Sequence, residues 1–231
     1  MVSPRPKFLL VCLRQICLLA FMLLFKVDLK AQDSLHKITQ PVYVHSSFFY
    51  DFPQSFGASL GTTFPVRSKK IITEFKGGKK IIRYRDLIVS SDFGFYRYPF
   101  NNSGIYFFQS IGKRYHKEMP YYFEWLIRLG ALRTFYDGLV YAVNDNGDVN
   151  VLKDYGRYYA VTGFTAVFGH DFERSKYPRP FSIAIKPSLW FQYPYNSFLL
   201  PHFSVEATFL YHFKSFNIGL KQKEVVQLLN K

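Results

Sequence analysis

Three polar residues near the C-terminal end could form a hydrolytic site. His202, Ser204 and Glu206 alternate along one stretch, and residues two apart share one face of a β-strand. A serine nucleophile, a histidine base and an acid are the groups that hydrolases combine. Same-face neighbours on a strand lie about 6.5–7 Å apart, which is too far for direct hydrogen bonds without help from other elements. The triad is therefore a hypothesis about an alternative, enzymatic function.

The His202-x-Ser204 pair also resembles the catalytic pair of the lipid A deacylases, which are barrels of this size. The resemblance covers three residues, and the acid of those enzymes lies farther downstream than Glu206 does here. It implies an outer-leaflet lipid hydrolase or acyltransferase as the alternative function.

Five charged residues fall on the polar faces of the expected strands: Asp92, Glu124, Arg128, Lys186 and Glu206. If these faces line a narrow interior, charges of both signs should pair there, because an unpaired buried charge is costly. The sequence therefore predicts a structural network of salt bridges in the interior. A pathway for protons or ions through a narrow channel is the alternative.

Two further patterns could bind ligands, and both have simpler explanations. The segment 145–150 offers oxygen ligands of the kind calcium loops use, but it lacks the closing glutamate, and Asn146-Gly147 is a hairpin-turn signal. We therefore expect a turn and no metal site or cofactor. A set of aromatics could resemble a sugar platform, and we interpret it as interfacial girdles: Tyr96, Tyr98, Phe100, Tyr121, Tyr122, Tyr158, Tyr159, Trp190, Tyr193 and Tyr195.

Alternating apolar and polar residues predict the elements that must position these groups. Strand side chains have period two, and the alternation is clearest at Phe203–Phe213 and in residues 181–193. The phase is ambiguous in the fourth strand and mixed in the sixth. Eight strands are expected, at residues 42–50, 56–64, 82–98, 105–115, 123–131, 158–170, 181–193 and 203–213.

The alternation predicts a closed, antiparallel, up-and-down transmembrane β-barrel. A soluble sandwich alternates too, but long strands with aromatics at their ends, behind a secretory leader, favour strands that face lipid outside and a polar lumen inside. In hydrocarbon the sheet must close, because open edges would leave amide groups unpaired. Eight strands enclose a lumen that side chains can fill. An even strand count places both termini in the periplasm.

The N-terminal residues predict export. Residues 1–31 resemble a signal peptide, with Arg5 and Lys7 before an apolar stretch and Ala31 at the expected cleavage point. An uncleaved anchor helix is the alternative. The expected organisation is a signal peptide at 1–31, a periplasmic segment at 32–41, an outer-membrane barrel at 42–213 and a periplasmic tail at 214–231.

Composition excludes several classes of site. The two cysteines, Cys12 and Cys17, both lie in the leader, so the mature chain would have neither disulfides nor cysteine-ligated metals. The formal charge is +14, but the basic residues are dispersed and form no nucleic-acid-binding module. A cationic rim against anionic lipid headgroups explains the charge more simply. We expect outer-membrane lipid or lipopolysaccharide as a partner and no nucleic acid.

Two long connections carry the remaining signals. We expect residues 135–157 to extend the fifth and sixth strands into an outer ribbon that contacts an envelope protein. Residues 67–85 are rich in lysine and carry their own Gly77-Gly78 turn. The strand count places this segment in the periplasm, where turns are usually short, so its side is left open. The tail after Phe213 is left open between a short amphipathic helix at residues 224–229 and an extension of the sheet at residues 216–220.

In size, alternation and leader, residues 42–213 resemble the small OmpA/OmpX-like outer-membrane barrels. The Ala31-Gln32 junction is similar to that of exported proteins of Bacteroidetes. The resemblance implies a Gram-negative outer-membrane location and this fold, on a scaffold that hosts many activities. We expect a non-enzymatic structural or interaction role at the cell envelope.

Overall fold

The computed structural model describes residues 36–52, 55–75, 80–143, 146–152, 155–195 and 198–229. The expected signal peptide at 1–31 lies outside these residues. Within them, no helix has the length and apolar character needed to cross a membrane.

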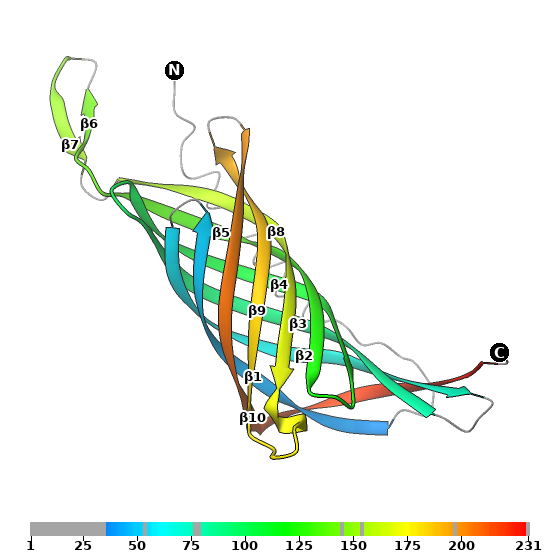
Figure 1. Cartoon of the computed structure of the whole chain (residues 1–231). Coiled ribbons are helices and arrows are strands. Elements are labelled where there is room, and N and C mark those ends of the chain that lie inside the picture. Colours follow the sequence, from blue (N-terminus) through cyan, green and yellow to red (C-terminus); the bar gives the residue numbers. More distant parts are fainter. Residues whose placement is uncertain are drawn as a thin grey trace. The chain divides into compact units, whose positions relative to one another are not determined.

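Eight long strands and one short hairpin make up the described chain (Figure 1). The long strands are β1 (His36–Phe52), β2 (Ser55–Phe75), β3 (Lys80–Tyr98), β4 (Asn102–Lys117), β5 (Tyr121–Tyr136), β8 (Gly156–Asp171), β9 (Phe181–Tyr195) and β10 (Phe198–Leu229). The hairpin consists of β6 (Val140–Val143) and β7 (Val149–Leu152), and a 3-10 turn, η1 (Phe172–Arg174), follows β8.

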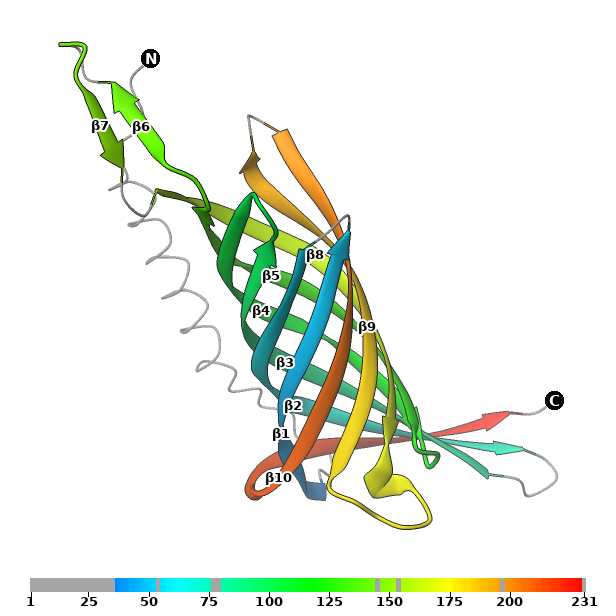
Figure 2. The same ribbon diagram turned by 60° about the vertical axis from the view of Figure 1, so that its left-hand side comes forward.

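The long strands form a closed ring, which confirms the predicted eight-stranded antiparallel barrel. Each strand pairs with the next along the chain, from β1 to β5, then β8, β9 and β10. The ring closes where β1 pairs with β10 from Val42–Phe213 to Phe52–Phe203. Figure 2 shows the strands winding around this ring at a common tilt.

Alternation sends apolar side chains outward and mostly polar ones inward. In β5, exposed and buried residues alternate strictly from Tyr121 to Leu129, as the sequence pattern predicted. The interior also contains two apolar clusters, one around Leu126 and Val167 and the other around Phe108 and Leu132. These inward apolar residues explain why the phase of β4 and β8 was hard to read from sequence.

The first and last strands, β1 and β10, are both longer than expected. β1 begins at His36, inside the segment expected to precede the barrel, and β10 continues to Leu229 through the expected tail. Residues 217–222 of β10 pair with the start of β1, and Gln222–Leu229 run parallel to Ser68–Phe75 of β2. The expected domain boundaries are therefore too narrow, and the 224–229 segment is strand. Pairing satisfies backbone amides that a free tail would leave to solvent.

Within the basic segment 67–85, residues 67–75 and 80–85 are also strand rather than loop. β2 and β3 stay paired from Arg67–Leu87 to Glu74–Lys80, and residues 76–79, which connect them, lie outside the described residues. Since β2 runs antiparallel to β1, this hairpin projects from the end of the ring where β1 begins and β10 continues (Figure 2).

The segment expected to form the outer ribbon contains a separate hairpin and does not continue the barrel strands. β5 ends at Tyr136 and β8 starts at Gly156, and the residues between them contain a separate two-stranded sheet, β6–β7. Gly147 in its turn has a φ of 84°, which glycine adopts without strain. The hairpin prediction for Asn146-Gly147 is confirmed, whereas continuation of the barrel strands into the ribbon is wrong.

Candidate functional site

The five predicted interior charges all lie inside the ring and are almost fully buried. Their exposed fractions are 3% for Asp92 and Arg128, 4% for Glu124 and Glu206, and 5% for Lys186. Burying charges at this depth is costly unless each finds a partner. The interior pairs are therefore the first candidate site.

Arg128 and Glu206 form an ion pair across the lumen. Arg128 Nη1 donates to Glu206 Oε1 at 2.7 Å, and the two residues come from β5 and β10, which are not neighbours in the ring. Lys186 of β9 lies directly opposite Glu206 in the strand register. Glu206 therefore has Arg128 as its ion-pair partner and Lys186 as its cross-strand neighbour, and the pair joins two strands that are not adjacent in the ring.

Asp92 and Glu124 pair with residues that the sequence analysis did not name. Asp92 Oδ1 lies 2.6 Å from Nε2 of His45, which β1 contributes from beyond β2. Glu124 Oε1 accepts from Arg114 Nε of the adjacent β4 at 2.5 Å. The Arg114 guanidinium also lies 4.6 Å from the ring centre of Tyr43 and 4.8 Å from that of Tyr122. Aromatic faces thus complete its surroundings.

At the end where β1 begins, histidines and acids close the interior. His116 Nε2 lies 2.9 Å from Asp86 Oδ2, and His212 Nδ1 lies 2.6 Å from Oε2 of Glu173 in η1. Ser182 Oγ lies 2.7 Å from the other ring nitrogen of His212. Side chains from five different elements therefore meet across this opening.

Asp171, Glu173 and His212 offer a set of ligand atoms that a metal ion could use. Arg174, however, already places a guanidinium on this set, with Nε 3.2 Å from Asp171 Oδ2, and it also contacts His116. A bound cation would have to compete with this built-in positive charge. The arrangement favours a neutralised side-chain plug over a metal centre.

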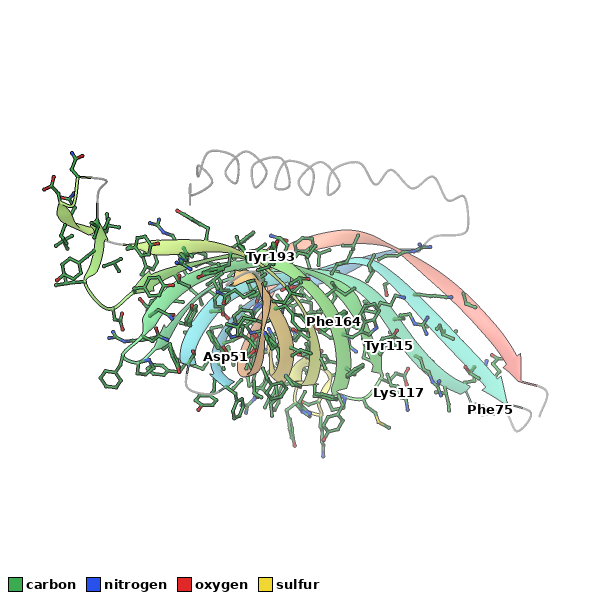
Figure 3. All side chains as sticks on the ribbon, turned by 90° about the horizontal axis from the view of Figure 1, so that it is seen from above. Asp51, Phe75, Tyr115, Lys117, Phe164 and Tyr193 are labelled. Atoms are coloured by element: carbon green, nitrogen blue, oxygen red, sulfur yellow. The ribbon has the colours of Figure 1, made fainter. Side chains whose placement is uncertain are left out.

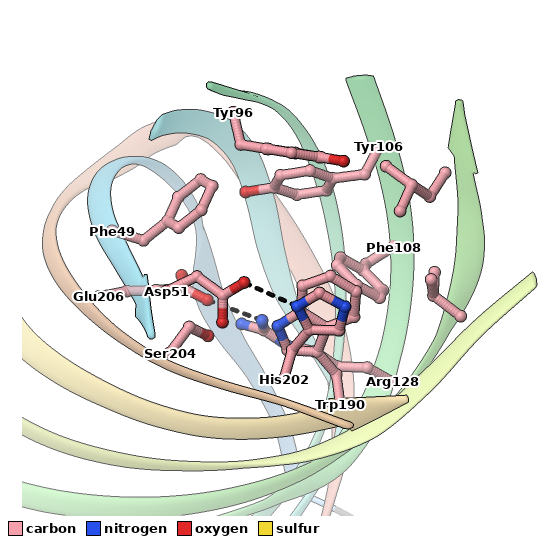
Figure 4. Close-up of a pocket in the computed structure, with 12 residues that line it drawn as sticks. Phe49, Asp51, Tyr96, Tyr106, Phe108, Arg128, Trp190, His202, Ser204 and Glu206 are labelled. Carbon is pink, nitrogen blue, oxygen red and sulfur yellow. Dashed lines mark hydrogen bonds and ion pairs between the residues drawn. The ribbon is translucent and has the colours of Figure 1, made fainter. Parts of the chain in front are cut away.

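At the other end, the predicted His202–Ser204–Glu206 set does not form a triad. His202 Nδ1 lies 2.8 Å from Asp51 Oδ2, and its Nε2 lies 3.1 Å from Gln192 Oε1. The imidazole stacks on Trp190 with ring centres 3.7 Å apart. Glu206 instead binds Arg128 (Figure 4). The acid beside His202 is Asp51, which sequence spacing could not reveal because it lies on β1.

Ser204 faces a cavity that is too small for a lipid substrate. The cavity has a volume of about 20 Å³ and is lined by Ser204, His202, Asp51, Tyr106 and other residues (Figure 4). That volume is enough for about one water molecule. With Ser204 only 3% exposed, an acyl chain has no access to its hydroxyl.

The expected aromatic girdle includes residues that point inward. Tyr121, Tyr158 and Tyr193 are about half exposed or more, at 68%, 48% and 54%. Tyr122 and Tyr159 are buried at 8% and 4%, and they pack in the interior. Assigning all ten aromatics to girdles was therefore wrong. Adjacent residues such as Tyr121-Tyr122 must face opposite sides of a strand.

The oxygen-rich segment 145–150, which the sequence analysis compared with calcium loops, lies between β6 and β7. Asp145 is outside the described residues. The described part of the turn is exposed from Asn146 to Asn150. This geometry is that of a solvent-facing hairpin turn.

Comparisons with known proteins report similarity of fold only. No protein-family profile matches the sequence, and no curated protein sequence matches it. Neisserial surface protein A is similar over 76% of this chain and 99% of its own, at 10% identity and a TM-score of 0.46. The N-terminal β-barrel domain of Pseudomonas aeruginosa OprF is similar over 75% of this chain and 100% of its own, at 12% identity and a TM-score of 0.39. The fold assignment rests on the ring of strands in this chain itself.

Proposed function

We propose that this chain is an integral outer-membrane barrel with a filled lumen and a non-enzymatic structural or interaction role. The observation that carries the proposal is the inversion of polarity across the wall. Large apolar side chains face outward, including Phe48 at 76% exposure, Leu60 at 66% and Phe164 at 60% (Figure 3). The charged residues described above face inward. A protein dissolved in water would arrange these sides the other way round.

Polar groups on the outer wall support the same conclusion because they satisfy each other. Ser91 of β3 and Gln109 of β4 lie opposite one another on the outward face. The Gln109 amide donates to Ser91 Oγ at 2.8 Å, and Ser91 Oγ lies 3.1 Å from Gln109 Oε1. Hydrocarbon offers no partners for such groups, so local pairing is what a lipid-facing wall requires.

The filled interior supports a structural role over transport or lipid chemistry. The cavity beside Ser204 has room for about one water molecule, and ion pairs bridge the lumen near it. A general pore needs a continuous wet path, and a lipid hydrolase needs a site open to an acyl chain.

The β6–β7 hairpin is the part of the chain best suited to bind an envelope protein. Tyr141 pairs with Val151, and Val143 pairs with Val149. All four side chains are exposed, at between 49% and 68%. An isolated two-stranded hairpin is marginal in water, and exposed apolar side chains on it favour a protein partner.

Membrane insertion is tested by fractionation and by mobility in detergent. We expect the protein in the outer-membrane fraction of a Gram-negative host, with gel mobility that changes on heating, as a closed barrel unfolds. A freely soluble, processed protein would refute the proposal. Planar-bilayer recordings should show no steady conductance, and steady single-channel currents would favour the narrow-channel alternative.

The hairpin's role is tested separately in the full chain. Changing Tyr141, Val143, Val149 and Val151 together to threonine should preserve heat-modifiable mobility, since the hairpin is a sheet apart from the ring. The same change should abolish cross-linking to a specific envelope protein. Changing Asp148 to Asn in the turn is the control and should leave the cross-link intact. Retained cross-linking in the fourfold variant would remove the hairpin from the proposal.

The enzymatic alternative has its own test. Ser204→Ala should leave the lipid A profile of the cells unchanged in mass spectrometry, because the hydroxyl faces a cavity too small for lipid. A lost acyl-chain modification in this variant would instead establish hydrolase or transferase chemistry.

A further inference from the structure

Six basic side chains gather on the outer wall where β2, β3 and β4 approach the end of the ring. They are Arg67, Lys69, Arg83, Arg85, Lys113 and Lys117, and each is exposed or partly exposed. We call them the basic patch. Figure 3 labels Lys117 and its neighbour Tyr115.

The strand register brings like charges face to face in this patch. Lys69 is directly opposite Arg85, and Arg83 is directly opposite Lys117. Directly opposed side chains on antiparallel strands have Cβ atoms about 4.5–5.5 Å apart, and like charges at that spacing destabilise the sheet. Two such pairs side by side imply that something negative compensates them.

The described outward faces of β2, β3 and β4 do not supply that negative charge. Among the described residues of β2, β3 and β4, no carboxylate lies on the outward face. Glu74 pairs with Lys80, and Asp86 points inward to His116. The structure describes no ion pair for the six cations. Two of them contact aromatic rings instead: Arg85 over Tyr115 at 5.1 Å and Lys113 over Trp125 at 5.6 Å.

The patch directly borders the apolar wall. One same-face step along the strands from Lys113 and Trp125 are Ile111 and Ile127, which are 50% and 38% exposed. That step is about 6.5–7 Å, so a ligand phosphate at the patch would have its acyl chains against this wall. Basic residues with Tyr and Trp beside them are the usual composition of a membrane interface.

We propose that the basic patch binds the phosphate groups of anionic phospholipid, with phosphatidylglycerol as the simplest case. The inference rests on the proposed membrane location and goes beyond it by naming the residues and the lipid chemistry. The patch lies at the end where β1 begins and β10 continues, which a barrel with periplasmic termini places in the inner, phospholipid leaflet. Each basic side chain near an anionic surface contributes about 1 kcal/mol, which is about a fivefold change in affinity.

Trp125 allows a direct test because it contacts Lys113 in the patch. The chain has two tryptophans, and a Trp190→Phe background leaves Trp125 as the only emitter. In vesicles, phosphatidylglycerol with brominated chains should quench Trp125 more strongly than brominated phosphatidylcholine at equal mole fraction. We expect about a fivefold or greater preference.

The double variant Lys69→Gln/Arg85→Gln removes two of the six contributions and should lower this preference about fivefold or more. The matched control is Arg97→Gln/Arg133→Gln, which removes two outward arginines at the other end of the same wall and should keep the preference. Equal quenching by the two lipids in the unmodified patch would overturn the proposal, as would equal loss in the control. Displacement of the lipid by inorganic phosphate alone would mean that the site binds phosphate without lipid. If the membrane location itself is wrong, neither brominated lipid will quench Trp125.

Discussion

Buried charges in the lumen form ion pairs that fill its cross-section, among them Arg128–Glu206, His45–Asp92 and Arg114–Glu124. Arg114 and Glu124 form one of these buried ion pairs, with side chains 7% and 5% exposed. Two aromatic faces flank Arg114. Removing one member of such a pair leaves the other charge buried without compensation, and that loss exceeds the net value of the pair itself.

Glu124→Gln should therefore lower the free energy of unfolding by about 3–5 kcal/mol. The measurement is urea unfolding in lipid vesicles, followed by tryptophan fluorescence. Glu74→Gln, which breaks the exposed Glu74–Lys80 pair, is the control and should cost about 0–1 kcal/mol. The double variant Arg114→Met/Glu124→Leu should be more stable than Glu124→Gln, because neither charge is then left alone. Equal costs for the buried and the exposed single variants would show that Arg114 has other compensation.

The partners of the interior charges show where sequence reasoning stopped. The faces of β3, β5, β9 and β10 could be read from alternation, so Asp92, Glu124, Arg128, Lys186 and Glu206 were placed inside. His45 and Asp51 come from β1, whose pattern is weak, and Arg114 comes from β4, where inward Tyr106 and Phe108 blur the phase. Ion pairs across the lumen depend on closure and register, which no single strand's pattern contains.

At the scale of the strands, the narrow interior of the ring limits the size of the side chains that point into it. Gly61 on β2 lies opposite His45 on β1 and Asp92 on β3. A Cβ at Gly61 would lie 2.5 Å from the His45 ring and 2.5 Å from the Ser91 carbonyl oxygen. The structure explains the glycine at this position, because the His45 ring fills the space that a side chain would take.

Gly61→Ala should push His45 away from Asp92 and lower the free energy of unfolding by about 1–3 kcal/mol, the usual cost of overpacking. The midpoint of the heat-modifiable shift is the measurement. Gly138→Ala serves as the comparison, since its Cβ would meet no atom within 4 Å, and its midpoint should not move. An unchanged midpoint for both variants would mean that β1 and β3 can relax around the added methyl group.

The sequence analysis misjudged two strand segments whose polar residues do not mark a solvent-exposed loop. Residues 67–75 and 80–85, expected to belong to a connection, continue β2 and β3 and carry basic residues on the outward face. The residues after Phe213 lack clear alternation, and their strand depends on pairing with β1 and β2. Neither outcome follows from local propensity, because both depend on distant partners.

For the whole molecule, the decisive feature is that the outer wall and the interior have exchanged their usual polarities. The proposed lipid surroundings make exposed phenylalanines favourable, and closure of the ring leaves the inward charges to pair with one another and with inward polar and aromatic groups. The basic patch then falls at the boundary between the apolar wall and solvent. The proposed boundary between hydrocarbon and water therefore explains three features together: the apolar outer wall, the charged interior and the position of the basic patch.

Placing a charged side chain on the outer wall should show whether hydrocarbon covers that wall. Phe164, 60% exposed on β8, lies beside Ile127 of β5 and Leu189 of β9. Phe164→Arg should lower the free energy of unfolding in vesicles by about 2–4 kcal/mol if hydrocarbon covers this position, because the guanidinium must leave water. Leu139→Arg, at a residue 71% exposed between β5 and β6, should change it by no more than about 0.5 kcal/mol, as for ordinary surface substitutions. If Phe164→Arg is tolerated as well as Leu139→Arg, water or protein rather than lipid covers the wall, and both the membrane location and the lipid site at the basic patch fail with it.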